Sequence, residues 1–457
     1  MRESDKKTIP FSPPDVGEME IERLAEVIRS GWITTGPKVA ELEQRIEGYI
    51  KKDICLDSKN EEQNTNGSRV ACLGSATAAL ELSLRILGIG SGDEVIVPAY
   101  TYTATASPVL HCGAKIVFTD IQKNGDPYSN APEPDYDAIE RAVSPRTKAI
   151  ILADIGGAVC DYDRVFGIVE RKRPLFAPKA SDGTVLGDLS SRIQKGLGCP
   201  AVIADCAHSL GSSRLICNTG CGPLKKAEWR KSGDNAHFSS FSFHAVKNFT
   251  TAEGGAATWN LPPSVYDQGV TDSEIHHMYR MLSLHGQSRD ALSKTAAGAW
   301  EYDVIGPWYK CNMTDLSAAV GLAQLDRYDG MLEHRHELIR RYDRCCDELG
   351  ISHLVHMTAQ MQSNGHLYMA RIPELDETGR NRLIQLLADM GVSANVHFKP
   401  LPMLTAYRSL GYDISRFPNA YDYYRCEISM PLYSRLTVED VEYVCDKLEK
   451  ALDIIRK

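Results

Sequence analysis

Five short apolar segments, separated by stretches with helical periodicity, constrain the fold of this chain more than any other feature. They lie at residues 70–73, 94–97, 115–118, 148–153 and 201–204. Buried parallel strands read as apolar runs of this length, and the helical stretches between them supply crossover connections. The pattern predicts an α/β fold with a mostly parallel central sheet flanked by helices on both faces. Ligands of such sheets bind beyond the carboxyl ends of the strands, so residues that follow each strand are the functional candidates.

The segments on either side of this pattern are organised differently. Two helices are expected before it, at 14–30 with Gly31 as a stop signal and at 38–50. After about residue 330 the sequence predicts a small α+β unit: a charged helix at 330–350, a strand at 367–372, a helix at 377–390, a strand at 392–398 and a last helix at 437–455. We therefore expect a large domain at 1–330 and a small C-terminal domain at 331–457.

The composition argues against several classes of function. With 51 basic and 60 acidic residues the formal net charge is −9, so no general positive field would attract nucleic acid. No run approaches the roughly 18 continuous apolar residues of a membrane span, and the N-terminal segment lacks the apolar centre of a signal peptide. The 13 cysteines are scattered and read as reduced thiols. The sequence thus indicates a cytoplasmic protein with no nucleic-acid and no membrane partner.

Side chains with distinct chemistry follow three of the predicted strands. Gly74-Ser75-Ala76-Thr77 leads into a helix, whose free N–H groups and hydroxyls suit a phosphate, although simple helix capping is the commoner use. Tyr102 follows the second strand and offers an aromatic face, or else packs in the core. Asp205 ends the fifth strand, where a carboxylate needs a cation such as a pyridinium nitrogen; a helix N-cap is the simpler alternative.

Lys247 follows a further apolar segment around Phe241 and has mostly uncharged neighbours. Desolvation there would lower the pKa of the amine and make it a nucleophile toward carbonyls, whereas an ordinary strand-end lysine keeps its ammonium in water. Ser242 lies in the same segment. A phosphate cradle, an aromatic face, a buried acid and a sheltered lysine at one edge of one sheet together predict a site for pyridoxal 5′-phosphate (PLP).

These residues lie in motifs that resemble a known family. The motifs include GWITTGP, SATAALELSL, VIVPAYTYTATA, DCAHSLGS and FSFHAVKNFTTAEGGA, and they follow one another over nearly the whole chain. In this respect the chain is similar to the DegT/DnrJ/EryC1/StrS family of PLP-dependent nucleotide-sugar aminotransferases, in the fold-type I aspartate aminotransferase superfamily. The resemblance implies that fold, PLP as cofactor, and a homodimer in which both chains contribute to each active site.

The resemblance also implies roles for individual residues. Lys247 would form the internal aldimine and carry the proton, Asp205 would pair with the pyridinium nitrogen, and His208 would lie near the phenolic oxygen. Tyr102 would stack on the ring. The phosphate would be held by Ser75, Ala76, Thr77 and Ser242, and by Asn312 or Lys310 of the neighbouring chain. Substrate contacts are expected from Trp32, Thr34, Thr35, Lys310 and His397, and no metal site is expected.

The implied reaction is a two-stage transamination. An amino acid, by analogy L-glutamate, gives its amino group to the cofactor, and a keto sugar attached to a nucleotide diphosphate then takes it. One alternative is a PLP-dependent sugar dehydratase of the same family, which carries histidine where this chain has Lys247. The other alternative is a PLP-fold binding module without turnover. The sequence leaves the sugar, the nucleotide, the carbon position and the pathway open.

The sequence departs from the family pattern at several places. Ala76 stands where glycine is common, and Lys310-x-Asn312 stands where many relatives read N-x-R. The spans 163–200 and 212–236 are longer than usual. Cys217 and Cys221 in the second span have the spacing of half a zinc site, but a closed site needs four ligands and no second pair is evident.

Overall fold

The computed structural model describes residues 7–51, 68–218, 223–288 and 301–456. Its centre is a seven-stranded sheet in the order β1-β9-β8-β5-β4-β2-β3. The strands are β1 (Val70–Leu73), β2 (Glu94–Pro98), β3 (Lys115–Thr119), β4 (Thr147–Ala153), β5 (Ala201–Asp205), β8 (Phe238–Ser242) and β9 (Gly255–Trp259). All neighbours pair in parallel except at β9, which is antiparallel to β1 and β8. The α/β class and the mostly parallel sheet are confirmed.

Strand β9 was not expected from the sequence. The Gly254-Gly255 pair predicts a turn, but Gly255 is the first residue of β9 and pairs with Ser242 of β8. Because β9 reverses direction between β8 and β1, those two strands remain parallel to each other. The carboxyl ends of β1, β5 and β8 therefore meet at one edge of the sheet, as the candidate residues require.

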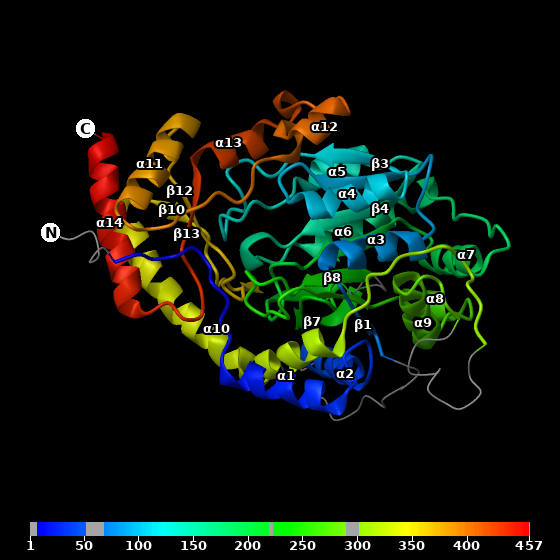
Figure 1. Ribbon diagram of the computed structural model, residues 1–457. Helices are drawn as coiled ribbons and strands as arrows, with labels where there is room; N and C mark the ends of the chain where they lie inside the picture. The colour runs from blue at the N-terminus through cyan, green and yellow to red at the C-terminus, as the bar shows by residue number, and fades with distance from the viewer. Residues whose placement is uncertain (1–6, 52–67, 219–222, 289–300, 457) are drawn as a thin grey trace.

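Helices cover both faces of this sheet (Figure 1). They are α3 (Ala76–Ile86), α4 (Thr103–His111), α5 (Tyr136–Ala142), α6 (Tyr162–Lys172), α7 (Val185–Leu197), α8 (Pro263–Tyr266) and α9 (Asp272–Ser283). The N-terminal helices α1 (Glu18–Ser30) and α2 (Pro37–Lys51) pack against the long helix α10 (Asp315–Leu349). Helix α1 ends as expected at Gly31, which adopts a left-handed φ of 76°.

The C-terminal part forms its own sheet and apolar cluster, which lies beside the central sheet at the far end of α10 (Figure 1). Its three antiparallel strands are β10 (Ser352–His353), β12 (Tyr368–Arg371) and β13 (Glu427–Met430), in that order. The helices α11 (Glu377–Asp389) and α14 (Val438–Arg456) contribute to this cluster. Buried residues of α12 (Thr405–Ser409) and α13 (Pro418–Cys426) belong instead to the apolar cluster of the central sheet. The predicted boundary at residue 330 falls inside α10, whose buried residues contribute to both apolar clusters. The division at 330 stays a prediction.

Two further segments differ from expectation. The predicted strand at 392–398 is wrong, because this segment makes only single bridges, at Val392 with Ile9 and at Asn395 with Ser429. The span 212–236 contains a hairpin of β6 (Ser213–Asn218) and β7 (Pro223–Lys231), extended by β11 (Met361–Gln362). Each helix in the described part of the chain is too short or too polar to serve as a membrane span. A cytoplasmic location stays a prediction.

Candidate active site

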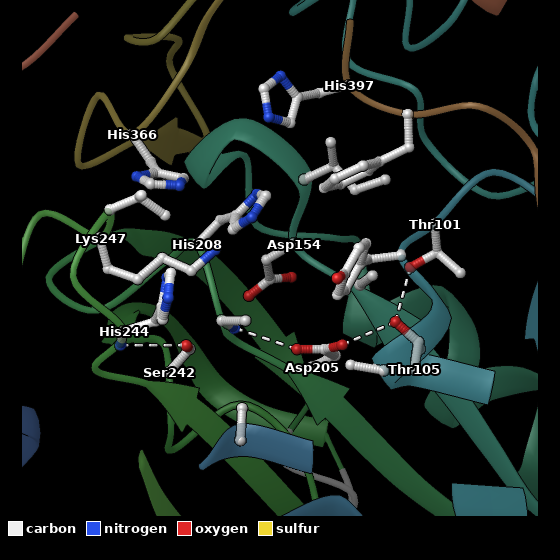
Figure 2. Close-up of a pocket in the computed structure, with 18 of the residues that line it drawn as sticks. Thr101, Thr105, Asp154, Asp205, His208, Ser242, His244, Lys247, His366 and His397 are labelled. Carbon is white, nitrogen blue, oxygen red and sulfur yellow. Dashed lines mark hydrogen bonds between the residues drawn. The ribbon is translucent and has the colours of Figure 1, made fainter. Parts of the chain in front are cut away.

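A cavity of about 390 Å³ opens at the carboxyl edge of the central sheet. It is lined by residues of β4, β5 and β8, by the start of α3 and by the loop around residue 397 (Figure 2). Nine of the predicted site residues line it, namely Ser75, Ala76, Thr77, Tyr102, Asp205, His208, Ser242, Lys247 and His397. Five others do not line it in the single chain, namely Trp32, Thr34, Thr35, Lys310 and Asn312.

Lys247 lies in the loop that follows β8, where its N–H donates to the carbonyl of His244 over 2.9 Å. Its side chain is partly buried and points into the cavity between His208 and His244 (Figure 2). Burial lowers the pKa of the Lys247 amine from 10.5 to about 8, and the negative charge of Asp205 opposes this shift. The amine is therefore neutral in a sizeable fraction of molecules at mildly alkaline pH, as a nucleophile toward an aldehyde must be.

This pKa predicts how the cofactor-free protein takes up PLP. The rate of covalent attachment should rise with pH and level off above about 8, because the neutral amine attacks the carbonyl and the ammonium does not. Stopped-flow absorbance after mixing with PLP, between pH 6 and 10, measures this dependence. A rate that still rises steeply near pH 10 would show an ordinary exposed lysine instead.

Asp205 is the last residue of β5 and is almost fully buried. Thr105 donates its hydroxyl to Asp205 Oδ2 over 2.7 Å, and the N–H of Ala207 donates to Oδ1 over 3.1 Å. The hydroxyl of Thr101 lies 2.7 Å behind that of Thr105 (Figure 2). Burial raises the pKa of the Asp205 carboxyl despite these donors and the charge of Lys247. A buried acid held in one orientation at the cavity wall fits the protonated ring nitrogen of PLP.

Asp154, which the sequence analysis did not identify, is a second buried acid at the cavity but has a different environment. It accepts hydrogen bonds from Ser209 over 2.7 Å and from Tyr162 and the Cys160 N–H over 3.0 Å each. Its carboxylate thus ties the loop after β4 to the loop after β5. We interpret Asp154 as a structural residue that holds these two loops together.

The start of α3 has the geometry of an anion site. Ser75 is the N-cap, and its Oγ accepts from the N–H of Ala78, so the Ser75 hydroxyl hydrogen is available to the cavity. Gly255 packs against this turn so closely that a Cβ there would lie 2.4 Å from the carbonyl carbon of Ser75. Ser242, which pairs with Gly255 across the sheet, lines the same part of the cavity. The backbone donors, hydroxyls and helix N-terminus fit the phosphate of PLP.

His208 lines the cavity near Lys247 and has a defined tautomer (Figure 2). Its Nδ1 accepts from the N–H of Gly156 over 3.2 Å, so the proton of the neutral ring is on Nε2. Burial lowers the pKa of His208 well below 6.5, and the charge of Lys247 lowers it further. His208 therefore offers a neutral N–H donor to the cavity, which suits an anionic oxygen such as the phenolate of PLP.

Aromatic rings form the outer walls of the cavity. The Tyr102 side chain is 57% exposed and its ring centroid lies 5.5 Å from that of Phe398. Phe11, which the sequence analysis did not identify, stacks on His397 with 5.5 Å between centroids and 16° between planes. These faces can pack against a planar ring or the apolar face of a sugar.

The five predicted residues outside the cavity largely form a cluster of their own. Asn312 donates to the Thr35 hydroxyl over 2.6 Å, and that hydroxyl donates to the carbonyl of Met313. Lys310 hydrogen-bonds to Asn312, and the Trp32 indole donates to the carbonyl of Thr35. The carbonyl of Thr34 accepts from the N–H of Asp315. We refer to Trp32, Thr34, Thr35, Lys310 and Asn312 as the outer cluster.

Metal chemistry finds no support in the part of the chain that is described. Within it no group of three or more histidine, cysteine, aspartate or glutamate residues is arranged to hold a metal ion. Cys217 is exposed, and Cys221 lies outside the described residues. The absence of a metal site stays a prediction.

Comparison with known protein families matches residues 14–175 and 192–449 to the DegT/DnrJ/EryC1/StrS aminotransferase family. The chain belongs to this family. Among curated relatives it is similar to the spore coat polysaccharide biosynthesis protein SpsC of Bacillus subtilis, with 31% identity over 98% of this chain and 97% of SpsC. The unmatched residues 176–191 fall inside the long span 163–200 that the sequence analysis singled out.

Solved structures are also similar to this chain over nearly its whole length. The chain is similar to the putative sugar aminotransferase Spr1654 of Streptococcus pneumoniae, solved in a pyridoxamine phosphate (PMP) form with 44% identity and a TM-score of 0.84, over 98% of this chain and 100% of Spr1654. The PLP form of Spr1654 matches with 42% identity and a TM-score of 0.83 over the same shares. PLP as cofactor and sugar aminotransferase activity, both implied by the motifs, are confirmed.

Proposed function

We propose that this enzyme transfers an amino group from L-glutamate to the keto group of a sugar carried by a nucleotide diphosphate. The proposal rests chiefly on the meeting of Lys247, Asp205 and the start of α3 in one cavity. When bound, PLP supplies the electron sink that stabilises the negative charge left after a proton is removed from a substrate carbon. The presence of Lys247 favours amino transfer over dehydration.

Each residue has a part in this proposal that follows from its position. Lys247 would hold the cofactor covalently and, when released, would move the proton between substrate and cofactor, since it is the single lysine among the described lining residues. Asp205, which Thr105 holds in place, would keep the ring nitrogen of the cofactor protonated. His208 donates from Nε2, and the start of α3 with Ser242 holds the phosphate. Tyr102 and the stacked rings of Phe11 and His397 would line the space that remains for the sugar.

The charge of the cavity supports a homodimer with shared sites. Among the described lining residues Lys247 is the single lysine and there is no arginine, so a diphosphate finds little positive charge there. A second copy would bring Lys310 and Asn312 of the outer cluster to the cavity mouth. Large apolar side chains on the surface also favour a second copy, with Ile21 and Ile28 of α1 being 56% and 63% exposed and Val304 49% exposed.

The acceptor can be tested with a panel of UDP- and dTDP-linked keto sugars and L-glutamate as donor. We expect at least one linked sugar to give 2-oxoglutarate at a rate well above that of the same keto sugar without its nucleotide, because the nucleotide diphosphate supplies binding energy. Equal rates for free and linked sugars would contradict the proposed substrate class. Release of 2-oxoglutarate without an aminated sugar would contradict amino transfer to the sugar.

A further inference from the structure

His366 is a buried histidine of the C-terminal part that reaches the active-site cavity. It lies two residues before β12, is 5% exposed and lines the cavity beside Lys247 and His208 (Figure 2). Its ring centroid is 4.3 Å from that of His208, with 51° between the planes. The sequence motifs assigned no role to this residue.

The hydrogen bonds around Asn248 define the tautomer of His366. The Asn248 amide nitrogen donates to the carbonyl of Asn364 over 2.9 Å, so its oxygen faces His366. That oxygen lies 2.9 Å from His366 Nδ1, and because the oxygen can only accept, the proton of the neutral ring is on Nδ1. Nε2 then carries a lone pair, for which no described residue supplies a donor.

His366 is neutral in the physiological pH range. Burial lowers its pKa well below 6.5, and the positive charges of Lys247 and Arg335 lower it further. Arg335 donates to the backbone carbonyl of His366 over 2.9 Å, which holds the residue against α10. The wall above Lys247 thus presents a donor, His208 Nε2–H, and beside it an acceptor, His366 Nε2.

A released lysine amine needs such an acceptor. After Lys247 has taken a proton from the substrate carbon, it is an ammonium with three donors in a desolvated site. Asn248, the next residue along the chain, is tied to the other nitrogen of the same histidine. This hydrogen bond fixes the His366 ring relative to the loop that carries Lys247.

We propose that His366 is a positioning residue for the proton transfer: its Nε2 lone pair accepts a hydrogen bond from the released Lys247 ammonium and holds it against the substrate. No bond other than this hydrogen bond forms or breaks at His366, and the proton stays on Lys247 until it is delivered. The inference rests on the proposed role of Lys247. A misplaced acid or base of this kind costs about 10- to 100-fold in rate.

Two substitutions separate this role from a structural one. His366→Gln places an amide near the position of Nε2 and keeps an acceptor in the cavity, but loses the donor to Asn248. His366→Asn keeps a donor for the Asn248 side-chain oxygen and loses the acceptor at the position of Nε2. The measurement is the single-turnover conversion of bound PLP to PMP by L-glutamate, L-glutamine, L-aspartate and L-alanine, taken for the donor that the wild-type enzyme uses fastest.

We expect His366→Asn to slow this conversion by about 10- to 100-fold and His366→Gln to stay within about fivefold of wild type. Borohydride trapping should show PLP still attached to Lys247 in both variants, which establishes that both are folded and loaded. A full rate in His366→Asn, or equal losses in the two variants, would overturn the proposal. A wild-type enzyme whose PLP is not trapped on Lys247 would instead contradict the proposed role of the lysine.

Discussion

Replacing Lys247 by alanine is expected to abolish the covalent attachment of PLP and to lower the rate of amino transfer by about 10²- to 10⁴-fold. The side chain supplies both the nucleophile that holds the cofactor and the base that moves the proton. The surrounding donors can still hold PLP by its phosphate, because Ser75, Ser242 and the start of α3 are untouched. The absorption spectrum of the loaded protein and the rate of 2-oxoglutarate formation measure the two effects.

Lys115→Ala is a matched control. Lys115 begins β3 at the amino end of the sheet, where its ammonium is exposed and pairs with Glu94 over 3.3 Å. We expect this variant to keep the wild-type spectrum and rate, since the Lys115 ammonium is exposed and Glu94 keeps its ion pair with Arg146. An unchanged spectrum in Lys247→Ala, or a similar loss in both variants, would be incompatible with the proposed site.

The Lys247→Ala variant also tests whether two chains share each active site. Lys247→Ala and Asn312→Ala proteins, each expected to have lost activity, should regain roughly a quarter of wild-type activity when they are mixed and exchange subunits, because half of randomly paired dimers carry one intact site. This expectation follows if the outer cluster serves the cavity of the other chain. No recovery in a mixture shown to contain heterodimers would mean that each chain completes its own site.

Replacing Asp205 by asparagine should have the second largest effect. The change keeps the shape but removes the negative charge that would face the ring nitrogen. Two unit charges about 4 Å apart interact by about 4 kcal/mol at an effective dielectric constant of about 20, which corresponds to about three orders of magnitude in rate. We expect a loss of this order in kcat, measured with saturating PLP so that weaker cofactor binding does not contribute.

Asp154→Asn is the control for this prediction, because it makes the same substitution at the other buried acid of the cavity. Asp154 is bound by Ser209, Tyr162 and the Cys160 N–H, so its loss should lower the midpoint of thermal unfolding, while turnover falls much less than in Asp205→Asn. If the two variants lost turnover equally, Asp205 would have no special relation to the ring nitrogen.

The sequence predicted the central sheet and the inner part of the site because both depend on local patterns. Asp205 ends an apolar strand, Ser75 and Lys247 follow one within a few residues, and parallel strands bring their carboxyl ends to one edge. Strand β9 was missed because Gly255 reads as a turn residue. Glycine is required at position 255 for close packing and not for a turn, since a side chain there would collide with the backbone of Ser75.

Residues that act through distant partners could not be predicted in this way. Thr105 and Asp205 are 100 residues apart, and His366 and Asn248 are 118 apart. Phe11 meets His397 only because the N-terminal segment pairs with the C-terminal part through Ile9. No periodicity in the sequence specifies these contacts. The outer cluster is the reverse case. Its motifs predicted contacts with cofactor or substrate, but in the single chain its residues do not line the cavity.

The central claim is that Lys247 holds PLP at this sheet edge, and peptide mapping after borohydride reduction tests it most directly. Reduction makes the bond between PLP and lysine permanent, and mass spectrometry of the digested protein then locates it. The structure predicts the added mass on the peptide that contains Lys247 and on no other. Finding it on another lysine, or finding none in a catalytically active preparation, would contradict the account.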